Sequence, residues 1–410
     1  MRNIEHKTQN TSLFKNKYEQ KGVTLIALVI TIIVMLILVG VTINMALNGG
    51  LFGYAKQGVR DTENKKAEEE AFASGKVTID GVTYDSIQDY MNGFPSGTPK
   101  AKPIDKVEID EKGILKENGA YTNNGKTAIV PKGFKIVADE NGEKSIDAGL
   151  VIQDEAENQY VWVPVEDGTL DRINWTDDGE PTDSDYKDEL PEELINSIKI
   201  NKGFYIGRYE AGSNSVRSVD GADTLTEVLT KKGLYPYNCV SQTNAINKIA
   251  EMYTNKEKYG VEATLPYISM WDETLKFVKD NEHNVMDSQK WGNFKSIAFK
   301  FTGKYCKDYD EDPSFAGTPI YIEGTNIDKP KDTSWLLTTG ASERNKAKNI
   351  YDLAGNVWEH ILFYDSNDIS AIFGGAFNID SINYGAASAF LSTRTLANAH
   401  IGFRPALYIK

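Results

Sequence analysis

The sequence is poor in cysteine and histidine. Its 410 residues include two cysteines, Cys239 and Cys306, and four histidines. There is no CxxC pair and no Cys/His cluster with zinc-ligand spacing, which excludes the common structural zinc sites. The two cysteines stand far apart in the sequence. One disulfide and two buried thiols are both compatible with that spacing.

Familiar catalytic and phosphate-binding motifs are also missing. The chain contains no GxSxG, no GxxxxGK[ST] and no GxGxxG, so common nucleophile-elbow and nucleotide-binding loops are excluded. The acidic run DYDEDP, residues 308–313, alternates carboxylates as a calcium loop does. Pro313 stands where such a loop needs glycine, and the twelfth position is not glutamate. We interpret this run as a solvated acidic loop.

Positive charge is scarce beyond the N-terminus. The net charge is −14, and the first 22 residues carry five cations against two anions, so the rest of the chain sums to about −17. A body this acidic repels phosphate backbones, which argues against nucleic acid as a partner. The chain is 40% hydrophobic and 25% charged, a composition typical of globular domains.

What the chain does have is one long apolar run. No charged residue lies between Lys21 and Lys56, and residues 23–46 are nearly all apolar. A helix of that length extends roughly 36 Å, enough to cross a hydrocarbon core of about 30 Å. The basic flank precedes it, so the positive-inside rule predicts residues 1–22 in the cytoplasm. We expect a single-pass protein of the cell membrane with an extracellular C-terminal domain.

The same stretch, KGVTLIALVITIIVMLILVGVTI, resembles the N-terminal signature of type IV pilins and pseudopilins. The resemblance implies cleavage after Gly22, Val23 as the first mature residue, and assembly into a pilus or secretion system. Ala27 stands at the fifth mature position, where the family usually has the glutamate linked to filament assembly. A plain membrane anchor and a pilin-like subunit both remain open.

The segment 47–104 is expected to connect the membrane helix to a larger domain. It begins with a charged stalk helix, or a linker, over residues 54–75. Asp80-Gly81 lies between two short β-type runs and predicts a hairpin, after which Asp85 is expected to cap a short helix. Three prolines and two glycines in residues 93–104 indicate a linker.

Residues 105–410 are expected to form one α+β domain with many loops. Short β-type runs alternate with turns, and SMWDETLKFVKDNE predicts an amphipathic helix with Trp271, Leu275 and Val278 on one face. The acidic segment TDDGEPTDSDYKDEL is expected to be a surface insertion.

Five motifs occur in order across this region: KGFYIGRYEAG, LPYISMWDETLKF, NIYDLAGNVWEHI, FGGAFN and IGFRPALYIK. Together they resemble the formylglycine-generating enzyme (sulfatase-modifying factor) family over roughly residues 120–410. The resemblance implies a C-type lectin-like fold, with small twisted sheets, few helices and much ordered loop.

The residues of these motifs also have a structural interpretation of their own. Gly355 and Asn356 suit a turn with positive φ, and Trp358 is expected to anchor a core. Arg404 offers five donors in a planar fork, suited to loop carbonyls or a carboxylate.

The resemblance also implies a structural calcium ion. In that family the asparagine and glutamate of the Gly-Asn-Val-Trp-Glu segment help to bind it, and Asn356 and Glu359 match those positions. Backbone carbonyls would complete the coordination shell. The alternative is that both side chains only hydrogen-bond the loop backbone.

Catalysis of the family's type is not expected. Oxygen-using members carry a reactive cysteine pair between the Gly-Gly motif and Gly-Phe-Arg. The matching residues here, 376–401, contain no cysteine. We therefore predict that this protein is not an enzyme.

Segment 376–401 instead resembles the hypervariable stretch of variable proteins from diversity-generating retroelements, which have the same C-type lectin-like fold. The resemblance implies a surface-displayed protein that binds an unknown extracellular protein or glycan. Gly385, Ala386, Ala387 and Ile401 are expected to be structural. A fixed loop, a structural pseudopilin and an enzyme of the formylglycine-generating type remain the alternatives. The candidate ligand-binding residues are Asn378, Ile379, Asp380, Ser381, Asn383, Tyr384, Phe390, Ser392, Thr393, Ala397, Asn398 and His400.

Overall fold

The computed structural model describes residues 76–91, 101–184, 188–217, 227–307, 319–362, 369–382 and 384–410. Several predicted features lie outside these ranges: the basic leader, the membrane helix with its cleavage residues Gly22 and Val23, the stalk, and the acidic loop 308–313. No helix within the described ranges is long and apolar enough to cross a bilayer. The chain divides into two compact units, Met1–Thr98 and Pro99–Lys410.

The first unit contains the predicted hairpin. Strands β1 (Val77–Ile79) and β2 (Val82–Tyr84) pair antiparallel. Asp80 and Gly81 both have positive φ, at 50° and 79°, as a two-residue type I′ turn requires. The paired strands and this turn confirm the predicted hairpin.

A short helix follows, α3 (Ile87–Met91). The prediction that Asp85 caps it is wrong. The backbone N–H of Asp89 donates to Ser86 Oγ at 3.1 Å, so Ser86 provides the cap. Asp85 lies one residue too early to reach that N–H and pairs with Lys76 at 3.4 Å.

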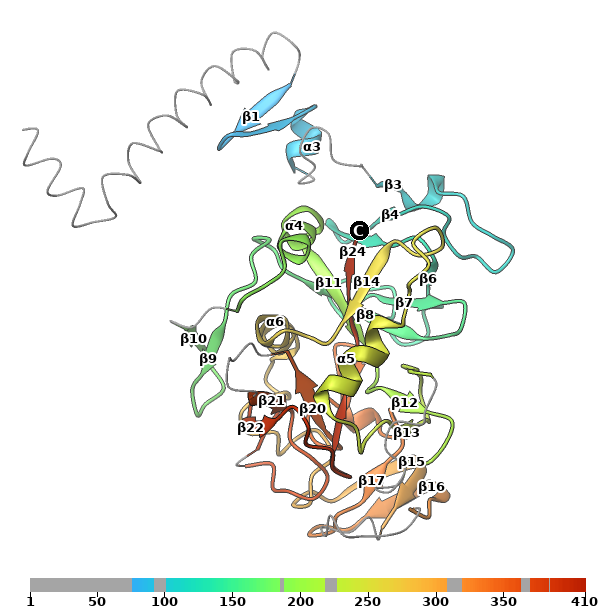
Figure 1. Ribbon diagram of the computed structural model, residues 1–410, viewed down its shortest axis with the longest axis vertical. Coiled ribbons are helices and arrows are strands. Elements are labelled where there is room, and N and C mark those ends of the chain that lie inside the picture. The colour runs from blue at the N-terminus through green and yellow to red at the C-terminus, as the bar shows by residue number, and fades with distance from the viewer. Residues whose placement is uncertain are drawn as a thin grey trace, which may run out of the picture. The chain divides into compact units, whose positions relative to one another are not determined.

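A six-stranded antiparallel sheet is the largest element of the second unit (Figure 1). The C-terminal strand β24 lies inside this sheet and pairs with β11 on one side and with β14 on the other. The order is β14-β24-β11-β8-β7-β6. The strands are β6 (Phe134–Ile136), β7 (Val151–Asp154), β8 (Gln159–Pro164), β11 (Gly203–Gly207), β14 (Val261–Thr264) and β24 (Ala406–Ile409).

Helices of the second unit are few. They are α4 (Glu192–Asn201), α5 (Gln242–Ala250) and α6 (Ile268–Val278). In α6 the side chains of Trp271, Leu275 and Val278 are fully buried, which confirms the predicted apolar face. The helix ends four residues earlier than its pattern suggested, because Lys279 adopts an extended backbone.

A second sheet has four strands in the order β22-β21-β20-β23. They are β20 (Trp358–Ile361), β21 (Ile369–Phe373), β22 (Ala389–Thr393) and β23 (Ile401–Phe403). All pairs are antiparallel except β20 with β23, which is parallel. This sheet therefore places the segment before Gly-Phe-Arg next to the Gly-Asn-Val-Trp-Glu segment.

Smaller sheets complete the unit. The predicted acidic insertion forms an exposed hairpin, β9 (Ile173–Trp175) with β10 (Pro181–Asp183). Two further sheets have three strands each: β3 (Lys102–Pro103), β4 (Gly119–Asn123) and β5 (Lys126–Val130) form one, and β15 (Phe299–Cys306), β16 (Ile322–Lys329) and β17 (Leu336–Leu337) form the other. Two more sheets are pairs: β12 (Gly212–Ser213) with β13 (Tyr235–Pro236), and β18 (Lys346–Ala347) with β19 (Ile350–Tyr351). Two 3-10 turns, η1 (Ile104–Lys106) and η2 (Glu343–Asn345), lie beside them.

The main core joins both larger sheets to α6. It includes Trp271, Trp291 and Phe294, all nearly inaccessible to solvent. Cys239 and Cys306 are both buried thiols, so the second of the two cysteine alternatives applies. The domain is sheet-rich α+β, as the alternation of short β-type runs predicts.

Trp358 belongs to a smaller core cluster with Ile372, Ala376 and Ile401. Truncating a buried aromatic side chain leaves a cavity, so Trp358→Ala should lower the free energy of unfolding by roughly 3–5 kcal/mol. Chemical denaturation followed by circular dichroism measures this loss. Leu391→Ala is the matched control, because Leu391 is mostly exposed. Equal midpoints for the two variants would contradict the assignment of Trp358 to the core.

Candidate binding face and its buried support

The candidate face is built on a tightly held connection. Gly374 and Gly375 link β21 to the segment that follows, with φ of 97° and 77°. A Cβ atom on Gly375 would lie 2.3 Å from the carbonyl oxygen of Tyr384. Only glycine allows the chain to pass itself this closely. The entry into segment 376–401 is thus fixed by backbone packing.

Main-chain hydrogen bonds hold the middle of the segment. The Ala387 N–H donates to the Val285 carbonyl at 2.8 Å. The indole N–H of Trp271 donates to the Ala386 carbonyl at 3.1 Å. A Cβ on Gly385 would meet the Met286 carbonyl oxygen at 2.3 Å. The positions predicted to be structural are therefore held by contacts with the helix α6 and the loop after it.

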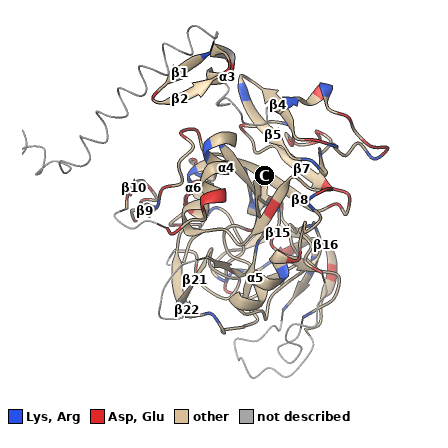
Figure 2. Ribbon diagram, turned by 45° about the horizontal axis from the view of Figure 1, so that its top comes forward, with Lys and Arg blue, Asp and Glu red and all other residues tan. Residues whose placement is uncertain are grey.

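Large apolar side chains emerge from this frame. Ile382, Tyr384, Phe390 and Leu391 are 61, 39, 54 and 61% exposed, and they are four of the ten large exposed hydrophobic side chains among the described residues. Strands β21 and β22 carry no charged residue (Figure 2). We call Tyr384 and Phe390, together with Ile382 in the loop before β22, the apolar patch. Leu391 follows Phe390 on β22 and faces the opposite side of the sheet.

Trp358 supports the patch from below. Its ring centroid lies 6.0 Å from that of Tyr384, edge to face, and 6.5 Å from that of Phe390. Trp358 itself is buried on β20. Aromatic pairs at these separations attract each other and limit rotation. The two exposed rings thus rest on a fixed indole.

The other predicted ligand-binding residues fall into three groups. Asp380 and Thr393 are exposed, whereas Asn378, Ile379, Ala397, Asn398 and His400 are half-buried. Asn383 and the Ser392 side chain lie outside the described part. Placing Ser381 on the face is wrong: it is 1% exposed, its N–H donates to Ser296 Oγ at 3.2 Å, and the two hydroxyls lie 3.3 Å apart.

A buried ion pair lies behind β20. The Arg404 Nη2 donates to Glu359 Oε1 at 2.6 Å, and Nε lies 3.0 and 3.1 Å from the two carboxylate oxygens. The remaining donors reach the carbonyls of Gly207 and Tyr351, both at 2.8 Å. Both side chains are inaccessible to solvent. Arg404 therefore satisfies both roles expected of it, toward loop carbonyls and toward a carboxylate.

A second buried carboxylate, Glu210, holds the Gly-Asn turn. Its oxygens accept hydrogen bonds from Asn356 Nδ2 at 2.6 Å and from the Val357 N–H at 3.2 Å. Burial raises the pKa of Glu210 well above its ordinary value, and the nearby Asp352 and Glu359 carboxylates raise that pKa further. Sequence reasoning did not single out Glu210, although it lies in the KGFYIGRYEAG motif.

The residues matched to a calcium site are engaged with the protein. Asn356 Oδ1 accepts hydrogen bonds from Asn293 Nδ2 at 3.0 Å and from the Leu337 N–H at 3.1 Å. Both oxygens of Glu359 face Arg404. Within the described ranges no cluster of three His, Cys, Asp or Glu side chains could hold a metal ion. The hydrogen bonds of Asn356 and the ion pair of Glu359 match the alternative of bonding within the protein, and the calcium site stays a prediction.

The predicted positive-φ turn is confirmed at the same place. Gly355 and Asn356 have φ of 75° and 60°, and a Cβ on Gly355 would lie 2.2 Å from the Asn293 carbonyl oxygen. The YDLAGNVWEHI segment is thus a structural corner. It directs Trp358 toward the apolar patch and Glu359 toward Arg404, because successive residues of a strand face opposite sides.

Several solved structures are loosely similar to this chain. A Treponema denticola variable protein 1 shares 11% identity over 67% of this chain and 99% of its own, with a TM-score of 0.32. PvdO from Pseudomonas aeruginosa shares 14% over 64% and 98%, with a TM-score of 0.34. A Major Tropism Determinant, variant M1, shares 12% over 77% and 89%, with a TM-score of 0.29.

These TM-scores all lie below 0.5, so we base no inference on the likeness. No protein-family model and no curated protein matches the sequence. The function must therefore be argued from the residues themselves.

His360 predicts a pH dependence of stability. Its Nε2–H donates to the Val240 carbonyl at 3.0 Å, and burial lowers its pKa from 6.5 to about 4. The unfolded chain takes up a proton near pH 6.5 and the folded protein does not. The contribution of His360 to the free energy of unfolding is therefore fully present above pH 6.5. It is lost as the pH falls toward 4, which lowers the free energy of unfolding by up to about 3 kcal/mol.

Melting temperatures measured between pH 7 and pH 4.5 test this expectation. His360→Asn cannot titrate and should show a shallower loss toward acid than the wild type. Parallel curves for the wild type and His360→Asn would refute the assignment.

Proposed function

We propose that residues 105–410 form a ligand-binding domain of the C-type lectin-like class, which recognises an extracellular protein or glycan without chemical turnover. The observation that carries the proposal is the apolar patch, Ile382, Tyr384 and Phe390, exposed on a frame that is itself buried. The order of the five motifs supports the fold class.

The patch has the physical properties of a recognition surface. Exposed apolar side chains gathered on one strand and the loop before it are typical of interaction sites. Tyr384 and Phe390 already rest on Trp358. Binding then orders fewer side chains, which lowers the entropic cost of association. Asp380 and Thr393 add polar groups in the same segment, as interface rims do.

The frame also suits a surface whose side chains vary. Its hydrogen bonds use main-chain groups of Ala386 and Ala387, and β22 pairs with β21 along its backbone. Substitutions at the exposed positions leave these bonds in place. We therefore propose that segment 376–401 is the diversified segment of a retroelement-type variable protein. Ser381 belongs to the frame, not to the face.

Population sequencing tests the proposal without knowledge of the ligand. Codons for the exposed residues of 376–401 should vary between individuals, at adenines relative to a nearby near-repeat in the DNA. Codons for Ser381, Gly385, Ala386 and Ala387 should stay constant. Uniform constancy of residues 376–400 with no near-repeat would leave a fixed loop with one dedicated partner.

We propose further that residues 23–46 anchor the protein in the cell membrane with the binding domain outside. The uninterrupted apolar run and its basic flank support this arrangement. The same residues favour a pilin-like subunit as the second candidate function, with assembly into a pilus or secretion system.

N-terminal sequencing of the protein from its native membrane separates the two. A pilin-like precursor is cleaved after Gly22, so its mature chain begins at Val23. A plain anchor keeps residues 1–22. We expect the intact form, because Ala27 replaces the glutamate that the pilin family uses. Gly22→Leu blocks cleavage in the pilin case and changes nothing in the other.

A further inference from the structure

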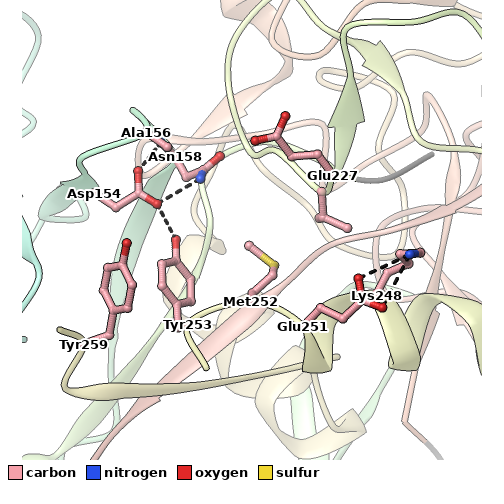
Figure 3. Close-up of a pocket in the computed structure, with 10 residues that line it drawn as sticks. Asp154, Ala156, Asn158, Glu227, Lys248, Glu251, Met252, Tyr253 and Tyr259 are labelled. Atoms are coloured by element: carbon pink, nitrogen blue, oxygen red, sulfur yellow. Dashed lines mark hydrogen bonds and ion pairs between the residues drawn. The ribbon is translucent and has the colours of Figure 1, made fainter. Parts of the chain in front are cut away.

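A cavity of about 230 Å³ lies where the turn between β7 and β8 meets α5 and the segment after it (Figure 3). It is separate from the apolar patch. Its volume is below that of pockets for drug-sized ligands, and it suits a single small chemical group. The side chains used here are Asp154, Glu227, Lys248, Glu251, Tyr253 and Tyr259.

Asp154 is a buried carboxylate without a counter-charge. It is 3% exposed. Its oxygens accept hydrogen bonds from the Asn158 N–H at 2.8 Å, Asn158 Nδ2 at 2.9 Å and the Tyr253 hydroxyl at 2.8 Å. All three donors are neutral, and no cation of the described residues pairs with Asp154. A buried charge normally has a partner of opposite sign.

The rest of the lining does not supply that partner. Lys248 is the cation of the pocket, and its ammonium group binds Glu251 at 3.2 Å. Glu227 adds an exposed carboxylate on the same cavity wall (Figure 3). The lining residues therefore carry two uncompensated negative charges, one buried and one exposed.

Aromatic side chains complete the wall. The rings of Tyr253 and Tyr259 lie 4.8 Å apart, edge to face. Met252 adds a polarizable thioether beside them. Ring faces attract cations, and Lys258 Nζ already lies 5.1 Å from the centroid of the Tyr259 ring. Carboxylates and aromatic rings around one small cavity favour the same class of ligand.

We propose that this cavity binds a primary alkylammonium group, carried by a lysine side chain or by a free diamine. Such a group provides the missing positive charge for Asp154 and an alkyl stem for the tyrosine and methionine surfaces. A neutral sugar would leave the charge uncompensated. The three donors leave about one lone-pair site on Asp154, which is enough for one N–H of an ammonium group but not for bidentate coordination of a metal ion. The proposal does not depend on the function of segment 376–401.

Isothermal titration of the full chain, purified in detergent, tests the proposal. The probes are butane-1,4-diamine and Nα-acetyl-lysine methylamide, with the Nε-acetylated form of the latter as the uncharged control. Both amines should bind saturably at low salt, and the uncharged control should not. Binding of only one amine supports the site and identifies the source of the group.

Three variants locate the binding. Glu227→Gln should weaken it about fivefold, the effect of one charge in a partly solvated site. Asp154→Asn should weaken it further. Glu323→Gln is the control, because Glu323 is an exposed carboxylate that does not line the cavity. If Asp154→Asn lowers the melting temperature, its weaker binding could reflect a loss of folding, and the test then depends on Glu227→Gln alone. No saturable binding of either amine, or equal binding by the wild type and Glu227→Gln, would overturn the proposal.

Discussion

The pairing of Arg404 with Glu359 is the interaction on which the rest of the domain depends. It joins the last strand region of the chain to β20, and its remaining donors hold carbonyls at the end of β11 and in β19. Removing one partner of such a pair leaves a buried charge, which costs several kcal/mol. One guanidinium thus joins the region before β24 to the end of β11 and to the YDLAGNVWEHI segment, which are distant in the sequence. Burial raises the pKa of Glu359, and Arg404 opposes that rise.

The apolar patch depends on the same arrangement. Glu359 faces Arg404, so its neighbour Trp358 must face the other side of β20, where it supports Tyr384 and Phe390. The Gly355-Asn356 turn sets the start of this alternation, and Glu210 holds the turn from behind. A change in the buried ionic network would therefore reach the surface through the position of one indole ring.

Local features were predictable because they depend on neighbours in the sequence. The face of α6 follows from the spacing of Trp271, Leu275 and Val278, and the hairpin follows from Asp80-Gly81. Features that join residues far apart in the sequence could not be predicted in this way. Ser381 is polar and was expected at the surface, but its partner Ser296 lies 85 residues earlier. The sequence indicated that Arg404 needs hydrogen-bond acceptors. It did not indicate that Glu359 is the carboxylate, because that pairing depends on the parallel alignment of β20 with β23.

The candidate site shows the same limit. Tyr384 and Phe390 were predicted on the face, but the exposure of Ile382 and of Leu391 was missed. Isolated apolar residues are normally assigned to a core, and only the burial of their neighbours shows that these two have no core to enter. Glu210 was missed for the opposite reason, since a glutamate is rarely placed in a core without a charged partner. The cavity beside Asp154 joins four stretches of chain and has no signature in any of them.

The position of β24 has a consequence for how the protein is made. Its four residues, almost the last of the chain, pair on both sides, with β11 and with β14. The main sheet therefore cannot be completed until residues 406–409 have been synthesised. A premature stop or frameshift within codons 376–401 would remove β24 and Arg404 together, and the truncated chain could not close its core. A frameshift in this segment thus abolishes the fold, whereas a substitution at one of its exposed positions leaves β24 and Arg404 in place.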